Sequence, residues 1–255
     1  MHIEVAGSGP ALVLIHGWAM HSGIFQPLRE RLERRCTLHL VDLPGHGRGA
    51  DRDAGLRLDE TTRAIAASTP PAVWLGWSLG GLFCLEAARE HPAQVRALSL
   101  ISASPRFVLA EDWMHGVAHD VFAGFGRDLG VNYRRTLERF LALECLGSDC
   151  AQAELRELRR HVFEHGEPSV RALADGLALL DTTDLRSALP GIEAPALWIA
   201  GARDRLVPPD AARWAADAMP HARAVVIPGG GHAPFVGHPD LVLAELEPFL
   251  DDLAR

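Results

Sequence analysis

The chain has 255 residues, of which 48% are hydrophobic, and its 25 basic and 33 acidic residues give a net charge of -8. This length suits one α/β domain with an insertion, and the net negative charge argues against broad nucleic-acid binding, because phosphate backbones favour basic surfaces. All the basic residues are arginines, which excludes chemistry that needs a lysine, such as a Schiff base or a Ser–Lys dyad.

The start of the chain and its cysteines predict a cytoplasmic protein. Residues 1–7 lack the basic region and the continuous apolar run of a secretory signal peptide. No apolar run approaches the ~20 residues of a membrane span. The four cysteines form no C-x-x-C pair, and a chain of this length needs no disulfide bonds; they are Cys36, Cys84, Cys145 and Cys150. We expect a cytoplasmic monomer with no membrane partner.

Short apolar runs alternate with helical patterns along most of the chain. The runs cover residues 11–15, 37–41, 72–75, 95–101, 196–200 and 222–227. Near-continuous apolar strands are typical of parallel sheets that helices cover on both faces. The alternation therefore predicts βαβ units and a mostly parallel, doubly wound sheet.

This alternation stops between about residues 105 and 189, where no strand pattern is found. Helical patterns cover residues 133–146, 152–164 and 169–180, and strands resume near residue 195. We interpret residues 105–189 as a helical lid inserted into the sheet domain. The sheet domain would then consist of residues 1–104 and 190–255.

Ser78 is the expected nucleophile, because it lies in a G-x-S-x-G motif between an apolar strand and a helix. Reactive groups of open α/β sheets lie beyond the carboxyl ends of the strands. A sharp turn at this point exposes the serine hydroxyl, and Gly76 and Gly80 leave room for the backbone to close. The N-terminus of the following helix also favours developing negative charge.

His232 and Asp204 are the expected base and acid. His232 follows the last strand, and we expect the flexible glycines 229–231 to let this loop carry the imidazole to Ser78. Asp204 follows the strand that ends at residue 200 and would hold the imidazole in the correct tautomer. Asp42 also follows a strand, but the chain order Ser, Asp, His favours Asp204. The strand at 95–101 is followed by no carboxylate.

The oxyanion hole requires two backbone N–H donors. We expect one from Leu79, directly after the nucleophile, and the other from Trp18 in the loop after the first apolar strand. The Trp18 indole would also form a wall of the acyl pocket. His16 precedes this loop and is expected to be structural, and His238 is expected to mark the entry of a helix.

Metal and nucleotide sites are disfavoured. Two histidine pairs could share a helix face, His115 with His119 and His161 with His165. Zinc needs a third ligand, however, and no His-Glu-x-x-His motif is present. The glycine-rich segments near residues 45 and 229 match no dinucleotide or phosphate-binding fingerprint. We expect neither a metal nor a cofactor.

Four motifs of the chain resemble the α/β-hydrolase superfamily over the whole length: HGW at 16–18, DLPGHG at 42–47, GWSLGG at 76–81 and GHAPF at 231–235. A narrower resemblance, to the BioH family of biotin-pathway carboxylesterases, rests on RFLALE at 139–144 and TDLR at 183–186. Trp18 and the His238-Pro239 pair after GHAPF are similar to that family as well.

The resemblance implies hydrolysis of the methyl ester of pimeloyl-acyl-carrier protein in biotin synthesis, with release of methanol. It also implies which residues line the substrate site: Trp18, Ser78, Leu79, Phe140, Leu141, Ala142, Leu143, Glu144 and His232. A second hypothesis is a hydrolase of small esters, lactones or carbon–carbon bonds without a carrier partner. A third is a ligand receptor on a hydrolase scaffold.

Arginines of the lid are candidates for docking the acidic acyl carrier protein. Two groups can each lie on a helix face, Arg134, Arg135 and Arg139 in the first and Arg156, Arg159 and Arg160 in the second. The alternative is that these are solvated helix faces on which the arginines pair with Glu138, Glu154 and Glu157.

Overall fold

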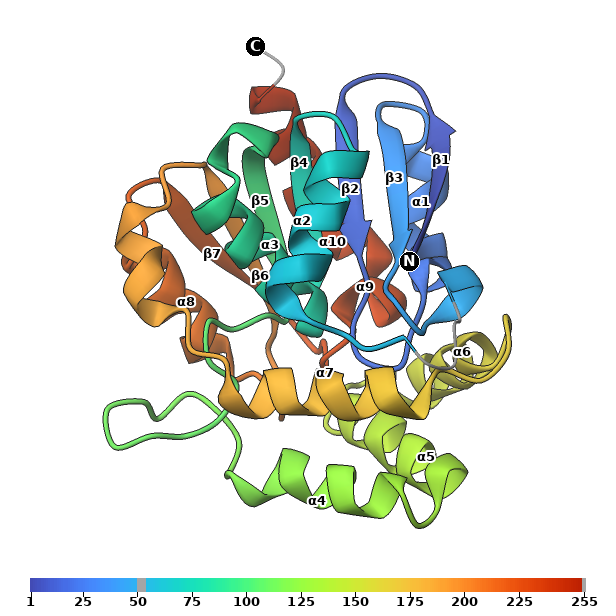
Figure 1. Cartoon of the computed structure of the whole chain (residues 1–255). Helices are drawn as coiled ribbons and strands as arrows, with labels where there is room; N and C mark the ends of the chain where they lie inside the picture. Colours follow the sequence, from blue (N-terminus) through green and yellow to red (C-terminus); the bar gives the residue numbers. More distant parts are fainter. Residues whose placement is uncertain (50–53, 254–255) are drawn as a thin grey trace.

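The computed structural model describes residues 1–49 and 54–253. Residues 50–53 and 254–255 fall within the predicted sheet domain and lie outside the described residues. Seven strands form one sheet in the order β1-β3-β2-β4-β5-β6-β7 (Figure 1). The strands are β1 (His2–Gly7), β2 (Ala11–Ile15), β3 (Thr37–Asp42), β4 (Ala72–Trp77), β5 (Val95–Ile101), β6 (Ala196–Gly201) and β7 (Ala222–Ile227).

All six predicted strands are present, and β1 is a seventh strand that was not predicted. This edge strand runs antiparallel to β3, with Ile3 opposite Val41, and all other neighbouring strands are parallel. Its residues are exposed or only half-buried, so β1 lacks the continuous apolar run that reveals the inner strands. The inner strand β4, by contrast, is buried at every residue.

Helices cover both faces of the sheet. In Figure 1, α2 and α3 lie in front of the sheet and α10 lies behind it, and α1 contacts α10. Their bounds, with those of the two remaining helices outside the lid, are α1 (Gln26–Leu32), α2 (Leu58–Ser68), α3 (Leu79–Glu90), α8 (Pro209–Asp217), α9 (Pro234–Gly237) and α10 (Pro239–Asp252). This layered arrangement explains why the inner strands are apolar on both sides.

Four helices follow β5 and precede β6 in the sequence, and they lie below the sheet in Figure 1. They are α4 (Asp120–Leu129), α5 (Tyr133–Glu144), α6 (Ala151–Val162) and α7 (Val170–Thr182). The last three match predicted helical patterns, but α4 was not predicted, because two glycines interrupt its helical sequence. Isolated bridges, such as Val108 with Val117, precede α4 where only helix was expected.

Within the described residues, no helix is both long enough and apolar enough to cross a membrane.

Candidate active site

Ser78 lies between β4 and α3 with a backbone φ of 52°, a left-handed conformation that is unusual for a residue with a side chain. The two glycines of the motif make this turn possible. A Cβ on Gly76 would lie 2.5 Å from the Gly80 carbonyl oxygen, and one on Gly80 would overlap the Ile15 carbonyl. The tight turn therefore presents the Ser78 hydroxyl at the carboxyl edge of the sheet.

The three residues predicted to form the triad lie in one hydrogen-bonded chain. Ser78 Oγ is 2.7 Å from His232 Nε2, and His232 Nδ1 is 2.8 Å from Asp204 Oδ2. The other oxygen of Asp204 accepts hydrogen bonds from the backbone N–H groups of Leu206 and Val207. Because a carboxylate can only accept a hydrogen bond, Nδ1 carries the imidazole proton. Nε2 is then free to accept the proton of the serine hydroxyl.

The glycines before His232 allow close packing, and their expected flexibility stays a prediction. A Cβ on Gly201 would lie 2.6 Å from the Gly230 carbonyl oxygen, so the loops that carry Asp204 and His232 are pressed together. A Cβ on Gly229, whose φ is +75°, would overlap Asp149, and one on Gly231 would lie 3.0 Å from Ser148 Cβ. Small residues are required at these positions because the lid and the β6 end leave no room.

Trp18 and Leu79, the predicted oxyanion donors, lie beside each other and under α7. A Cβ on Gly176 of α7 would lie 2.8 Å from Trp18 Cδ1 and 3.3 Å from Leu79 Cδ2. The Trp18 indole donates a hydrogen bond of 2.8 Å to the Leu173 carbonyl, which holds this ring against the same helix. Helix α7 thereby packs against both residues.

The predicted substrate-lining segment at 140–144 does not face one side. The Phe140 ring packs against Trp18 with centroids 4.4 Å apart, and Leu141 is buried. Leu143 is half-buried and Ala142 is exposed, because successive residues of a helix point in different directions. Helix α5 therefore brings Phe140 to the Trp18 side and turns Ala142 away from it.

Two glutamates near the triad are buried: Glu144, which was expected only to line the substrate site, and Glu154, which was expected only to pair with lid arginines. Burial, together with the charge of Asp204, raises the pKa of Glu144 well above 4.5, and both of its carboxyl oxygens lack a hydrogen-bond partner among the described residues. Burial raises the pKa of Glu154 to about 7. Glu154 lies four residues before the buried Leu158, so a charged residue within an apolar helix face was the available signal.

Asp42, the alternative acid, belongs to a separate cluster. Its carboxylate accepts the backbone N–H groups of Ser22 at 2.8 Å and Arg48 at 2.9 Å, and it stabilises the turn after β3. His16 accepts the Leu43 N–H at 3.0 Å, and burial, with the nearby His46, lowers the pKa of His16 to about 3. His16 is thus a neutral structural residue.

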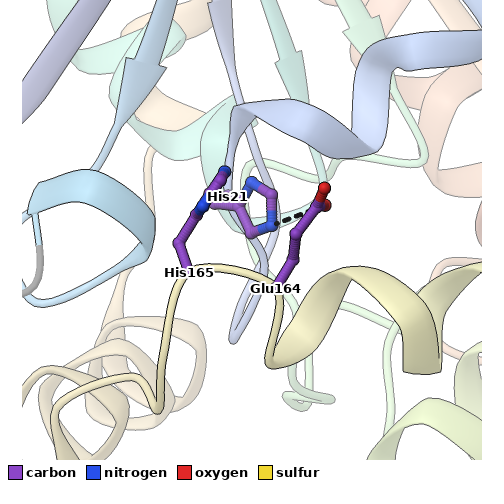
Figure 2. A group of neighbouring side chains, drawn as sticks. All are labelled: His21, Glu164 and His165. Atoms are coloured by element: carbon purple, nitrogen blue, oxygen red, sulfur yellow. Dashed lines mark ion pairs between the residues drawn. The ribbon is translucent and has the colours of Figure 1, made fainter.

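Figure 2 shows a histidine and glutamate cluster in which His21, Glu164 and His165 place ligand-type atoms within 4.8 Å of one another. The ring of His21 is already committed to the backbone. Its Nδ1 accepts the Gly23 N–H at 3.0 Å, so Nε2 carries the proton and donates to the His161 carbonyl at 2.9 Å. Neither nitrogen offers a free lone pair to a metal, so we assign His21 a structural role.

Neither predicted histidine pair shares a helix face. Helix α4 begins at Asp120, after both His115 and His119, and α6 ends at Val162, between His161 and His165. The His161 ring instead lies 2.8 Å from the Glu164 carboxylate, and the His115 ring packs against Trp113. His238 is the N-cap residue of α10, as its position before Pro239 indicated.

Four of the six arginines predicted to dock the carrier protein form ion pairs on the surface. Arg134 pairs with Glu167, Arg139 with Asp128, Arg159 with Glu138 and Arg160 with Glu157. The two exceptions are Arg135 and Arg156, whose side chains are exposed and have no hydrogen bond or ion pair with any residue that the structure describes. The expected pairing with Glu154 is absent, because Glu154 points inward and is fully buried.

The chain matches the alpha/beta hydrolase fold family over residues 10–239. A pimeloyl-acyl-carrier protein methyl ester esterase of Xanthomonas campestris pv. campestris is 57% identical over 250 residues, 98% of each chain. The esterase of the same name from Stenotrophomonas maltophilia is 56% identical over 254 residues, 100% of this chain and 98% of the relative.

Solved structures of lower identity share the fold. An esterase from Exiguobacterium antarcticum aligns with a TM-score of 0.85 at 21% identity and covers 100% of this chain and 95% of its own. A bromoperoxidase from Bacillus anthracis aligns with a TM-score of 0.88 at 21% identity, over 98% of this chain and 94% of its own. The chain therefore belongs to the α/β-hydrolase fold family and, within it, to the pimeloyl-acyl-carrier protein methyl ester esterases.

Proposed function

We propose that this chain is a serine carboxylesterase that hydrolyses the methyl ester of pimeloyl-acyl-carrier protein and releases methanol and free pimeloyl-acyl-carrier protein for biotin synthesis. The observation that carries this substrate is the 57% identity, over 98% of both chains, to the esterase of that name from Xanthomonas campestris pv. campestris. The hydrogen-bonded chain of Ser78, His232 and Asp204 supports the ester chemistry.

Acylation begins when Ser78 Oγ attacks the ester carbonyl and its proton passes to His232 Nε2. Asp204 holds the imidazole at Nδ1 and stabilises the imidazolium that forms. The backbone N–H groups of Trp18 and Leu79 bind the oxyanion. His232 then gives its proton to the departing methoxide, which leaves as methanol, and the pimeloyl group remains on Ser78 as an ester.

Deacylation uses water as the second nucleophile. His232 removes a proton from the water, the resulting hydroxide attacks the acyl-enzyme, and the proton returns to Ser78 Oγ as the free carboxylic acid leaves. Ser78 is only 2% exposed and His232 only 1%. We expect movement of the lid helices to widen the access of substrate to these two residues.

The carrier protein docks on the lid in this proposal. An acyl carrier protein is acidic, and the exposed arginines of α5 and α6 give the lid a matching basic face. Arg135 and Arg156 support this best, because their guanidinium groups are not neutralised by neighbouring carboxylates of the described chain. The remaining arginines of the two groups would have to exchange an internal ion pair for one with the partner.

The test combines turnover of the carrier-bound ester with growth. We expect the purified protein to release methanol from pimeloyl-acyl-carrier protein methyl ester, and Ser78→Ala to lose turnover by a factor of at least ~10³. Expression should also let a biotin-requiring strain that lacks this esterase grow without biotin.

Two results would overturn parts of the proposal. Hydrolysis of a short p-nitrophenyl ester without hydrolysis of the carrier ester would instead indicate a general small-ester hydrolase. A fluorophosphonate probe that fails to label Ser78 would reject the serine mechanism and favour a ligand receptor on this scaffold.

A further inference from the structure

The connection between α5 and α6, residues 145–150, lies against both loops that carry triad residues. Just before it, the Glu144 carbonyl accepts the His232 N–H at 3.1 Å. Within the connection, the Asp149 N–H donates to the Gly229 carbonyl at 3.1 Å. On the other side, a Cβ on Gly147 would lie 2.9 Å from the Arg203 carbonyl oxygen, next to Asp204. The position of His232 therefore depends on how this part of the lid is seated.

Glu154, in the first turn of α6, fills the remaining space between the lid and the His232 loop. Its Oε1 accepts a hydrogen bond of 2.8 Å from the Ser148 hydroxyl. A Cβ on Gly237 would overlap this same oxygen, and one on Gly231 would lie 3.5 Å from Oε2. The residue has no exposed surface, and its Oε2 has no hydrogen-bond partner among the residues described.

The charges around Glu154 are unfavourable for a second anion. Asp149 and Asp204 both oppose its ionisation, and His232 is the group that favours it. The other titratable groups of the surrounding elements include Glu144, Cys145, Cys150, Arg159, Arg203, Arg205 and His238. Desolvation of the buried carboxyl is the largest effect, and it keeps Glu154 neutral through mildly acidic pH and lets it ionise near neutrality.

We propose that Glu154 is a positioning residue for His232: as a neutral acid it seats the His232 loop against the lid, and its ionisation loosens that contact and slows ester hydrolysis. The inference rests on the proposed function, since His232 matters only if it serves Ser78. A buried carboxylate with one hydrogen bond and two acidic neighbours gains free energy by admitting water. Water can enter only if α6 and the loop separate, which misaligns the imidazole.

The test compares kcat/KM of wild type and Glu154→Gln between pH 5.5 and 8.5 on a short p-nitrophenyl ester. Glutamine keeps the shape of the neutral acid and cannot ionise. We expect kcat/KM of the variant divided by kcat/KM of the wild type to be near 1 at pH 5.5. As the pH increases, this ratio should rise several-fold and then level off, with a midpoint near pH 7. Glu157→Gln is the matched control on the same helix, where the side chain faces solvent and pairs with Arg160; its ratio should stay flat.

Ser148→Ala gives an independent check that leaves Glu154 in place. The Ser148 hydroxyl stabilises the ionised carboxylate, so its removal raises the pKa of Glu154. The fall of kcat/KM should therefore move to higher pH in this variant. A Glu154→Gln ratio that is flat or falls with pH, or a Ser148→Ala profile that coincides with wild type, would overturn the inference. These outcomes leave hydrolysis of the carrier ester by the wild type intact, so they are distinguishable from failure of the proposed function.

Discussion

Three buried carboxyl groups lie near His232, and they differ in their hydrogen bonds. Asp204 accepts from the His232 ring and from two backbone N–H groups, which together stabilise an anion. Glu154 has one hydrogen bond, and Glu144 has none through its side chain. Asp204 is thus the carboxyl group with the most hydrogen-bond donors around it, and burial favours the neutral form of both glutamates.

Glu154 also makes the stability of the fold depend on pH. The unfolded chain releases this proton near pH 4.5, whereas burial in the folded chain raises the pKa to about 7. The folded state binds more protons between these values, so stability falls as pH rises from 4.5 to 7. The free energy of unfolding falls by about 3 kcal/mol over this range, because a tenfold change in proton affinity corresponds to about 1.4 kcal/mol.

We therefore expect Glu154→Gln to have a larger free energy of unfolding than wild type at pH 8. The difference between the two proteins should be about 3 kcal/mol smaller at pH 4.5. Urea unfolding of both proteins at several pH values measures this difference, and Glu157→Gln serves as the reference for an exposed site. A constant difference across the pH range would contradict a buried neutral acid at position 154.

The triad could be predicted at the residue scale because each member follows a strand at the same edge of a parallel sheet. Ser78, Asp204 and His232 come after β4, β6 and β7, and strand ends are visible in the sequence. Glu144 and Glu154 could not be assigned in this way. Their burial results from how the lid docks on the His232 loop, and helical periodicity alone does not fix that docking.

At the scale of elements, α7 packs against Trp18 and Leu79, the two residues proposed to bind the oxyanion, and Gly176 lies at this contact. Glycine in a helix interior costs about 1 kcal/mol relative to alanine, so a packing reason is expected there. The reason is the contact with Trp18 and Leu79, where an added Cβ would lie 2.8 Å from the indole and 3.3 Å from the leucine. The lid helix and the oxyanion residues thus share one tightly packed interface.

Gly176→Val should push α7 or the Trp18 ring out of place and disturb the oxyanion donors. We expect kcat on a small ester to fall by about 10- to 100-fold, since loss of one oxyanion donor costs about 10²-fold or more. Steady-state kinetics measures the change, and Ala174→Val is the control, because Ala174 lies on the exposed face of the same helix. Equal activity of the two variants would show that α7 does not hold the oxyanion residues.

The elements themselves differed in how well the sequence predicted them. The inner strands are buried on both faces and leave a continuous apolar signal. Strand β1 lies at the sheet edge with mixed exposure, and α4 contains two glycines, so neither leaves a clear pattern. Residues 140–144 show a further limit: a motif that is continuous in sequence points to several sides once it is helical.

At the scale of the whole molecule, net charge and local charge have opposite signs. The chain carries a net charge of -8, yet α5 and α6 carry six of its arginines on the lid, at the edge of the sheet that holds Ser78. Under the proposed docking, a negatively charged partner would be repelled by the molecule as a whole and attracted by this face. Such an arrangement favours one docking orientation and makes association depend on salt.

Charge reversal at Arg135 and Arg156 tests this docking face with little disturbance of the fold, because neither side chain pairs with another described residue. For the double variant Arg135→Glu and Arg156→Glu we expect kcat/KM on the carrier-bound methyl ester to fall about 10- to 100-fold, chiefly through slower association. A short p-nitrophenyl ester has no carrier to dock and should be cleaved at the wild-type rate.

The matched control is Arg96→Glu, an exposed residue near the amino end of β5, at the edge of the sheet away from the lid. It changes the net charge in the same direction and should leave the carrier-bound ester almost unaffected. Raising the salt concentration from 50 to 500 mM, conditions chosen to screen surface charges, should narrow the gap between the double variant and wild type. The double variant carries two charge reversals and Arg96→Glu carries one, so a loss per reversal that is the same at all three positions would mean that only the overall charge matters, and would contradict docking on this face.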